Sequence, residues 1–583
     1  MTPIKYKLIG MILIPLLCIF CTTEEKEKRL NILWLVAEDL SANYINAYGD
    51  GTVLTPNIDR LAREGVVYTN SFSVSGVCAP SRSTLATGLY PNAFGAHNMR
   101  NLKMVPSASD LGLFDYQVVP PKEVKMVSEI MRERGYYCTN NAKEDYQFFK
   151  SELAWDESDK YAHWRNRPKK RMPFFSIFNF EVTHESVMWS NKKGKYERGK
   201  YPPNRNIDQQ KKSNENFDNH FQFPKNLKVE VPPYLPQNEI GENAMRRMYH
   251  NIIRMDKAVG KILAQLEEDG LLDQTIIMWY TDHGGPLPRH KRLLYDSGLK
   301  VPLIIRYPDG SRAGEKDERL ISFVDYPPTL LSLAEIVAPS YMQGHAFEGK
   351  YKSSKPREFI HGQADRFDER VDMIRAVRDK RFKYLKNFNP EKPYYLPIAY
   401  RESMEIMQEL LRMRDAGTLD KNQSLWFRQR KEVEELFDIE NDPHELRNIA
   451  GNPAYAKVLE MMRSECERWM NSINDKGFIK ELDLIEQFYP GGKPQFTAPV
   501  EIQIDKQSLA LSCPTPGARI GYRYSSEKAP YLGWNHYSEP IVLKPKDTLE
   551  IITHRLGFKH AITKVYEGEV IKTLYPLIKH ELN

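Results

Sequence analysis

One block of residues could support nucleophilic chemistry on an anionic substrate. Cys78-Ala79-Pro80-Ser81-Arg82 places a cysteine, a proline and an arginine close together, and the small residues Ser83-Thr84-Leu85-Ala86-Thr87-Gly88 follow. Pro80 and Ser81 suit the start of a helix, whose N-terminal amides stabilise an anion. A structural thiol is the alternative interpretation of Cys78, because free cysteine is among the most buried residue types.

Two apolar runs end in side chains that could hold a metal ion. The run Asn31 to Ala37 stops at Glu38-Asp39, and the run Thr275 to Thr281 stops at Asp282-His283. Short apolar runs predict buried strands, and open α/β sheets place their sites at the carboxyl ends of strands. Hard divalent cations prefer carboxylate oxygens. The sequence therefore predicts candidate metal ligands at two strand ends.

Strands and helices alternate along the chain, which predicts an α/β architecture. Apolar runs from Pro173 to Phe180 and from Val301 to Arg306 are typical of core strands. Apolar residues between Ile252 and Leu266 recur at helical spacing. The stretch from Ser190 to Pro236 is rich in Lys, Asn, Gln and Pro, and we expect a long surface insertion near the substrate.

The composition is that of a soluble globular protein with more than one structural unit. The 583 residues are 41% hydrophobic and 27% charged, which excludes disordered and fibrous classes. The net charge of +6 does not argue for nucleic acid, but it is compatible with a polyanionic substrate.

The N-terminus predicts export. Lys5 and Lys7 precede an apolar run from Leu8 to Cys21, which is the layout of a signal peptide over residues 1–21 and is shorter than the roughly 20 apolar residues that span a bilayer. Cys21 ends this run and resembles a bacterial lipoprotein cleavage site, so it is a candidate for lipidation. We expect an exported protein, periplasmic or anchored as a lipoprotein at the cell surface, with outer-membrane attachment by lipid.

The Cys78 block resembles the signature of the type I sulfatases, in which C-x-P-S-R precedes a small-residue stretch that ends in T-G. The resemblance covers residues 30–450 and implies an alkaline-phosphatase-like mixed sheet flanked by helices. It also implies that Cys78 is oxidised to 3-oxoalanine (formylglycine) by a formylglycine-generating or anaerobic sulfatase-maturating enzyme. One hydroxyl of the hydrated aldehyde would attack sulfur, and the other would then expel sulfate.

The same resemblance implies a calcium site. One Ca²⁺ would be bound by residue 78 and by the two strand ends, that is by Glu38, Asp39, Asp282 and His283. Glu38 departs from the usual aspartate of the family, and its longer side chain leaves its direct contact with the ion open.

By the same resemblance, four further side chains would act on the nucleophile or on the sulfate group. Arg82 would fix the hydrated aldehyde, and Lys143 would clamp sulfate, although Glu144-Asp145-Tyr146 replaces the usual continuation after this lysine. His184 would donate a proton to the leaving oxygen or contact sulfate. Lys291 lies in a segment similar to K-x-x-x-Y-E-x-G-x-x-V-P and would bridge sulfate and the nucleophile.

Five further polar residues are candidate sugar contacts, because an aromatic residue flanked by arginine suits stacking on a sugar and holding an anion. A packed surface loop explains the same residues equally well. These candidates are His97, Asn98, Arg100, His163 and His290.

We expect a sulfatase catalytic domain over residues 30–385, its C-terminal subdomain over 386–498, and a small β-sandwich over 499–583. The last segment resembles the C-terminal domain of bacterial hexosaminidases. The predicted substrate is a sulfated polysaccharide, with algal polymers such as ulvan favoured and a heparan-type glycosaminoglycan as the alternative. Phosphoesterase activity is a second alternative, against which the Cys78 block argues. A carbohydrate-binding lipoprotein with a decayed catalytic domain is a third.

Overall fold

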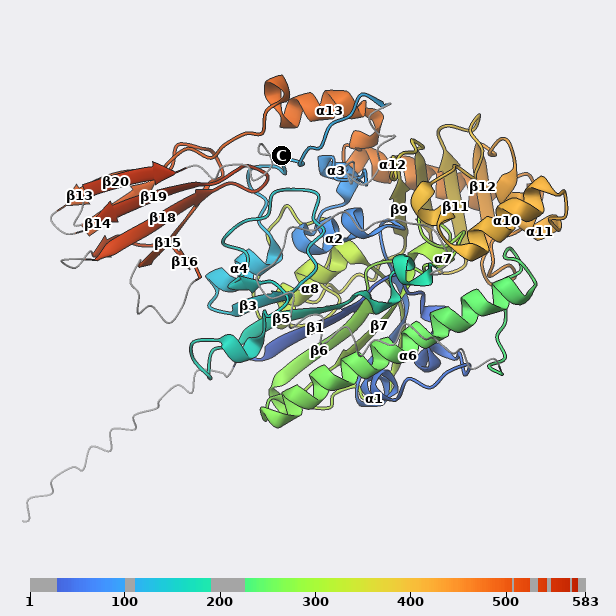
Figure 1. The fold of residues 1–583 in the computed structure, drawn as a ribbon, viewed down its shortest axis with the longest axis horizontal. Helices are drawn as coiled ribbons and strands as arrows, with labels where there is room; N and C mark the ends of the chain where they lie inside the picture. The colour runs from blue at the N-terminus through green and yellow to red at the C-terminus, as the bar shows by residue number, and fades with distance from the viewer. Residues whose placement is uncertain are drawn as a thin grey trace, which may run out of the picture.

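The computed structural model describes residues 29–99, 111–189, 226–505, 508–524, 533–542, 547–566 and 569–574. Its described part contains an eight-stranded sheet, a four-stranded sheet, and two antiparallel sheets of three and five strands near the C-terminus (Figure 1). The signal peptide expected at 1–21, Cys21, Arg100 and most of the insertion expected at 190–236 lie outside the described residues.

The large sheet has the strand order β4-β3-β5-β1-β6-β7-β2-β8. Its bounds in that order are Glu157–Ser158, Tyr137–Asn141, Phe174–Phe180, Asn31–Ala37, Thr275–Thr281, Lys300–Arg306, Val66–Phe72 and Lys316–Ser322. All neighbours pair parallel except β7, which runs antiparallel to both β6 and β2. The four strands predicted from apolar runs are therefore confirmed as β1, β5, β6 and β7, and the α/β class is confirmed with them.

Both faces of this sheet are covered by helices, which explains why its strands read as continuous apolar runs. In β1, Leu33 and Leu35 face one core, and Ile32, Trp34 and Val36 face the other. The first core is closed by α1 (Pro56–Glu64) and by the long α6 (Glu239–Glu268), which lies along the sheet in Figure 1. The second core is closed by α2 (Cys78–Thr87), α4 (Val127–Glu133) and α8 (Tyr326–Leu333).

The remaining helices are short or lie outside the large sheet. They are α3 (Pro91–Phe94), α7 (Asp296–Leu299), α9 (Ala399–Glu402), α10 (Glu405–Asp415), α11 (Lys421–Ser424), α12 (Ala456–Ser472) and α13 (Glu481–Phe488). Of the helices in the described ranges, none has the length and apolar character needed to cross a membrane.

The second sheet begins earlier than the boundary expected at 385/386. Its antiparallel order is β12-β11-β10-β9, with bounds Glu434–Asp438, Phe382–Asn387, Ile374–Arg378 and Ile360–Ala364. The expected boundary falls inside β11, whose Leu385 pairs with Ala376 and with Glu435. A break there would split one hydrogen-bonded sheet.

The C-terminal region forms two antiparallel sheets that pack face to face. One contains β13 (Glu501–Asp505), β14 (Ser508–Ser512) and β17 (Ile541–Val542), and the other contains β15 (Arg519–Tyr524), β16 (Asn535–His536), β18 (Thr548–His554), β19 (Ala561–Tyr566) and β20 (Glu569–Leu574). Leu509 and Leu511 of the first sheet share one core with Leu549, Ile551 and Val565 of the second. The predicted β-sandwich is confirmed.

A buried histidine at the end of β18 should make this region sensitive to acid. His554 is 1% exposed, and neither of its ring nitrogens has a hydrogen-bond partner. Burial, and then His560, lower its pKa to about 3, so the folded state binds fewer protons than the unfolded state below pH 6.5.

We therefore expect the free energy of unfolding to decrease as the pH falls from about 6.5 towards 3. The contribution of His554 to the free energy of unfolding should drop by about 2 kcal/mol between pH 8 and pH 5. In thermal unfolding scans, His554→Phe should gain stability over the wild type at pH 5 and much less at pH 8. An equal difference at the two pH values would contradict a neutral, buried imidazole.

Candidate active site

Neighbouring parallel strands bring the acidic residues of the site together. β1 and β6 pair in register with Ala37 opposite Thr281, so Asp39 and Asp282 leave the sheet side by side. The backbone N–H of Asp39 donates to Oδ1 of Asp282 at 3.2 Å. Asp39 has a φ of 46°, a left-handed conformation that aspartate tolerates better than most residues.

Cys78 is the first residue of α2, and its thiol faces these strand ends. The residue is 1% exposed. Its Sγ lies 3.4 Å from Nε2 of His283 and 4.0 Å from Oδ1 of Asp39. Burial raises the pKa of Cys78 well above its usual range, although Lys291 opposes the shift. The unmodified side chain is thus a neutral thiol.

Arg82 lies one helical turn beyond Cys78 and joins three segments of the chain. Its guanidinium donates to Oδ2 of Asp282 at 3.0 Å, to Oε1 of Glu38 at 3.1 Å and to Oδ1 of Asn179 at 2.8 Å. The rigid fork of donors in arginine suits such a role. Arg82 therefore orients carboxylates from both β1 and β6.

Glu38 shares one oxygen between two cations and leaves the other without a partner. Nζ of Lys143 lies 2.7 Å from Oε1 of Glu38, the same oxygen that Arg82 reaches. Oε2 is buried and has no hydrogen-bond partner. Burial raises the pKa of Glu38 to about 7, although Lys143 and Arg82 lower it. A buried carboxylate oxygen in this state suits a bound cation.

Lys291 links Asp39, His184 and the thiol. Its Nζ lies 2.8 Å from Oδ2 of Asp39, 3.3 Å from Nε2 of His184 and 3.6 Å from Sγ of Cys78. Burial opposes the charge of Lys291, but Asp39 outweighs it and raises the lysine pKa well above its usual range. For His184, burial and then Lys291 lower the pKa to about 4.

Arginines on either side of Lys291 hold its loop in place. Nη1 of Arg292 lies 2.9 Å from Oε2 of Glu185, and Arg289 donates to the backbone oxygen of Glu445 at 2.7 Å. Arg289 and Arg292 have φ values of 65° and 73°. Such conformations persist only where the surroundings determine them strongly. Glu445 follows the second sheet, so that sheet helps to fix the position of Lys291.

The donor set fits a divalent cation. Ligand atoms of Cys78, Asp282 and His283 all lie within 4.8 Å of one another, as do those of Asp39, Cys78 and His184. Glu38 belongs to neither group, but its buried Oε2 has no hydrogen-bond partner and could also bind a cation. Asp39 and Asp282 contribute carboxylate oxygens to these groups, and carboxylate oxygens are the ligands that hard divalent cations prefer.

Of the predicted sugar contacts, the four that the structure describes (His97, Asn98, His163 and His290) are not brought to this cluster. His97 and His290 are 2% and 0% exposed, and His290 stacks on Tyr44 with ring centroids 5.9 Å apart. Oδ1 of Asn98 accepts the backbone N–H of Arg366. His163 is half-buried, and its Nε2 contacts Gln265 of α6 at 2.8 Å. Their contacts are with the protein itself.

Glu185, Arg292 and Asn179 belong to the site and were not among the predicted residues. The backbone N–H of Glu185 donates to Oδ2 of Asp39 at 2.7 Å, and its carboxylate lies 3.2 Å from Nζ of Lys291. Burial opposes ionisation of Glu185, but Arg292 and Lys291 outweigh it and lower its pKa to about 2. Glu185 directly follows His184, and Arg292 directly follows Lys291. Adjacency to a predicted residue was therefore the signal in the sequence that could have identified these two.

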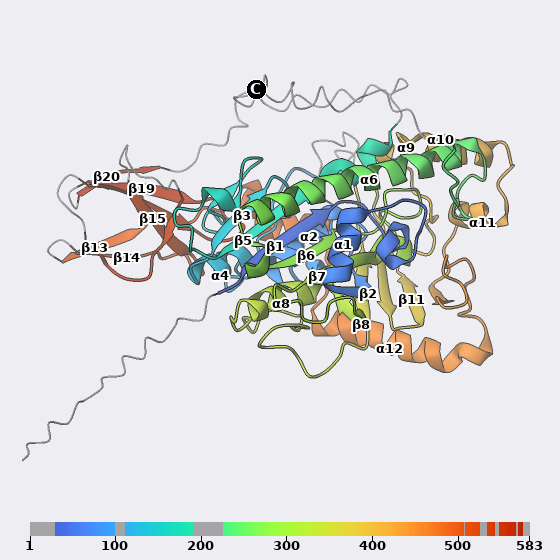
Figure 2. The same cartoon turned by 90° about the horizontal axis from the view of Figure 1, so that it is seen from below.

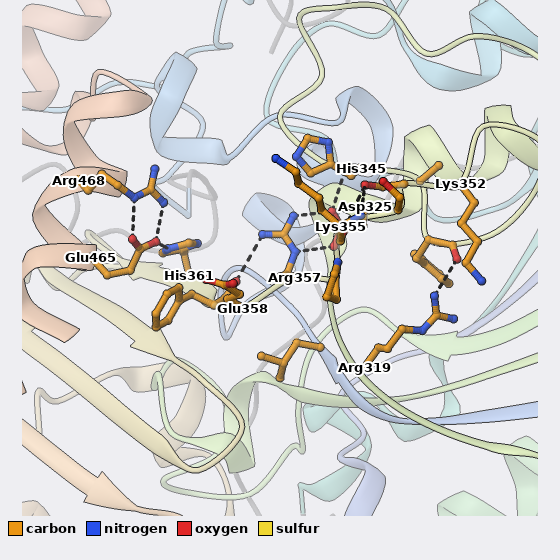
Figure 3. Close-up of a pocket in the computed structure, with 17 residues that line it drawn as sticks. Arg319, Asp325, His345, Lys352, Lys355, Arg357, Glu358, His361, Glu465 and Arg468 are labelled. Atoms are coloured by element: carbon orange, nitrogen blue, oxygen red, sulfur yellow. Dashed lines mark hydrogen bonds and ion pairs between the residues drawn. The ribbon is translucent and has the colours of Figure 1, made fainter. Parts of the chain in front are cut away.

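A separate hollow of about 890 Å³ lies beside strand β8 and is drawn in Figure 3. Its arginines are already paired, Arg357 with Asp325 at 2.7 Å and Arg468 with Glu465 at 2.6 Å. His361 lines it and contacts Tyr90, just beyond α2. The described residues that line the hollow include no member of the cluster around Cys78. The hollow is therefore distinct from the reactive cluster.

Comparisons with known proteins identify families and relatives to which this chain is similar. A family model described as sulfatase matches residues 30–336, and a model of the C-terminal region of N-sulphoglucosamine sulphohydrolase matches residues 289–410. An ulvan-active sulfatase of Formosa agariphila is 46% identical over 568 residues, covering 93% of this chain and 94% of the relative. Human N-sulphoglucosamine sulphohydrolase is 23% identical, covering 76% and 90%.

Solved structures share the fold. A protein solved in complex with its substrate D-glucosamine-2-N,6-O-disulfate superposes with a TM-score of 0.54 at 18% identity, covering 78% of this chain and 100% of that one. Sulfatases in general use formylglycine and a divalent metal. Since the sulfatase model matches over half of the chain and the Formosa agariphila enzyme is similar along nearly all of it, the protein belongs to the sulfatase family and is a sulfuric ester hydrolase.

Proposed function

We propose that this enzyme removes sulfate from a sulfated polysaccharide, ulvan or its oligosaccharides, with formylglycine at position 78 and one Ca²⁺. The main support for this reactive centre is the position of Sγ of Cys78, which lies 3.4 Å from Nε2 of His283 and 3.6 Å from Nζ of Lys291. The 46% identity to an ulvan-active sulfatase supports the substrate. A glycosaminoglycan is the second candidate, supported by the likeness to N-sulphoglucosamine sulphohydrolase.

The cations of the cluster would bind the sulfuryl oxygens. In the structure, Lys143 and Lys291 neutralise the carboxylates of Glu38 and Asp39. A calcium ion held by Glu38, Asp39, Asp282 and His283 would supply Lewis-acid polarisation when bound. The lysine ammonium groups are then available to an anionic ester, in a buried site where charge interactions are strong.

Residue 78 and His184 would act on opposite sides of sulfur. Oxidised to formylglycine and hydrated, residue 78 supplies the hydroxyl nucleophile. His184 is neutral at pH 7 in the structure, since burial and Lys291 lower its pKa to about 4. A bound sulfate ester adds negative charge beside it, which raises the pKa of this imidazole and favours proton delivery to the leaving oxygen. Overall, water is consumed and a sugar hydroxyl and sulfate are released.

Calcium should stabilise the fold of the enzyme as well as support turnover. Carboxylates of Glu38, Asp39 and Asp282 are all buried, so an added cation relieves their mutual repulsion. Saturating Ca²⁺ at 100 times its Kd should add about 2.7 kcal/mol to the free energy of unfolding. We expect a higher Tm with Ca²⁺ than with a chelator, and a much smaller difference in Asp282→Asn. No shift of Tm with any divalent cation would contradict the proposed site.

The activity is tested by sulfate release from ulvan, carrageenan, fucoidan and heparan oligosaccharides. Protein co-expressed with a formylglycine-forming enzyme is the active sample, and Cys78→Ala is the blank. Release from ulvan alone supports the proposed substrate, and release from heparan alone supports the second candidate. No release from any member, with formylglycine present by mass spectrometry, would contradict a polysaccharide substrate of these classes.

We further propose export of the enzyme, maturation of Cys78 by a formylglycine-forming enzyme, and lipidation of Cys21. The proposals of export and of lipidation rest on the sequence alone, since residues 1–28 lie outside the described part of the chain. Mass spectrometry of the purified protein tests both modifications.

A further inference from the structure

The reactive cluster can be reached from only one side among the described residues. The side chains of Glu38, Asp39, Asp282 and His283 are at most 1% exposed, and those of Arg82 and Lys291 at most 7%. Lys143 is 16% exposed and His184 is half-buried. A substrate must therefore approach past His184 and Lys143, and its sugar must lie outside them.

An aromatic pair stands next to His184 on this side. The ring of Tyr400, in α9, lies 6.3 Å from the ring of His184 in an edge-on arrangement. Trp189 lies 4.7 Å from Tyr400, also edge-on. The backbone oxygens of Met188 and Trp189 accept hydrogen bonds from Arg247 of α6 at 3.0 and 2.7 Å. α10, which follows α9, packs against the N-terminal end of α6 (Figure 2). Tyr400 and Trp189 are both half-buried.

The cation that faces the Tyr400 ring is already paired. The guanidinium of Arg292 lies 5.8 Å from the centre of the Tyr400 ring, and it is paired with Glu185 at 2.9 Å and with Asp368 at 2.5 Å. Because Arg292 is paired with these two carboxylates, it is not available to bind a second anionic group of the substrate. Half-exposed aromatic rings without net charge suit the C–H face of a pyranose.

We propose that Tyr400, supported by Trp189, binds the sugar ring that carries the sulfate and so determines specificity beside the reactive centre. This inference rests on the proposed function. It adds a substrate contact from α9, which lies between β11 and β12 of the four-stranded sheet in the chain. The class of ligand is an uncharged pyranose face. The anion itself is bound elsewhere, by Lys143 and Lys291.

Steady-state kinetics of Tyr400→Ala, on the oligosaccharide that the wild type desulfates best, test the proposal. KM should rise roughly three- to tenfold, the range that one aromatic contact supplies, and kcat should change less. The inhibition constant of inorganic sulfate should stay within about twofold of the wild-type value, because sulfate lacks the ring. Tyr400→Phe should keep the wild-type KM, since the flat ring remains.

Tyr161→Ala is the matched control, because Tyr161 is 58% exposed and lies outside the cluster. If Tyr400→Ala does not fold, Tyr400→Leu fills the space without a flat face and should show the same rise in KM. An unchanged KM in the folded variant overturns the inference, as does a parallel rise in the sulfate inhibition constant. Failure of the wild type to release sulfate from every oligosaccharide would instead contradict the proposed function.

Discussion

Cys78→Ala is expected to fold like the wild type and to release sulfate at least about four orders of magnitude more slowly, the scale of losing a nucleophile. The thiol is buried among Asp39, His283 and Lys291, and formylglycine can form there only from the side chain of residue 78. Removing one sulfur atom leaves the surrounding ion pairs intact. Sulfate release measures the effect, and thermal unfolding verifies the fold.

Cys138→Ala is the matched control for this substitution. Cys138 is also a free and fully buried thiol, but it lies within β3, where its Sγ contacts the backbone oxygen of Ser128. It should cost some stability and leave the rate of sulfate release unchanged. Full activity of Cys78→Ala, or equal inactivation by both substitutions, would rule out residue 78 as the nucleophile.

Lys291→Met is expected to lower kcat by about 10²- to 10³-fold, the usual loss when one transition-state donor is removed. Nζ of Lys291 contacts Asp39 at 2.8 Å and Glu185 at 3.2 Å, so the variant also leaves two buried carboxylates with less compensation. Breaking a buried ion pair costs about 3 kcal/mol or more. The Tm should therefore fall, and kcat must be measured well below it.

Lys316→Met provides the comparison, because Lys316 is exposed on the edge strand β8. It should change neither kcat nor the Tm appreciably. If Lys291→Met kept wild-type turnover at a temperature where it is folded, Lys291 would have no part in sulfate binding.

The centre of the large sheet was predictable because each of its strands is buried on both faces. Asn31–Ala37 and Thr275–Thr281 are buried throughout, are apolar in their central residues, and end at the polar residues that form the site. The boundary within the C-terminal part was less predictable. Strands of five or six residues, such as β10 and β11, leave too short a pattern to show that they belong to one sheet.

The supporting charges of the site could not be predicted from sequence patterns alone. Neighbouring residues in a loop point in directions set by local backbone conformation, and Arg292 has a positive φ of 73°. Nothing in the sequence shows that this arginine turns inward to Glu185. His290 shows the opposite case. Its position between an arginine and a lysine suggests an exposed residue, but it is fully buried and its ring contacts those of Tyr44 and Tyr234.

The wall around Cys78 comes from late parts of the chain. Besides Asp39, its Sγ contacts His283 and Lys291, which follow it by 205 and 213 residues. At a synthesis rate of about 5–20 residues per second, these segments leave the ribosome roughly 10–40 seconds after residue 78. Because the closed site leaves Cys78 only 1% exposed, an oxidising enzyme would have to act within that interval or on a chain kept unfolded. The separation of these residues along the chain would therefore place the proposed oxidation of Cys78 before closure of its site.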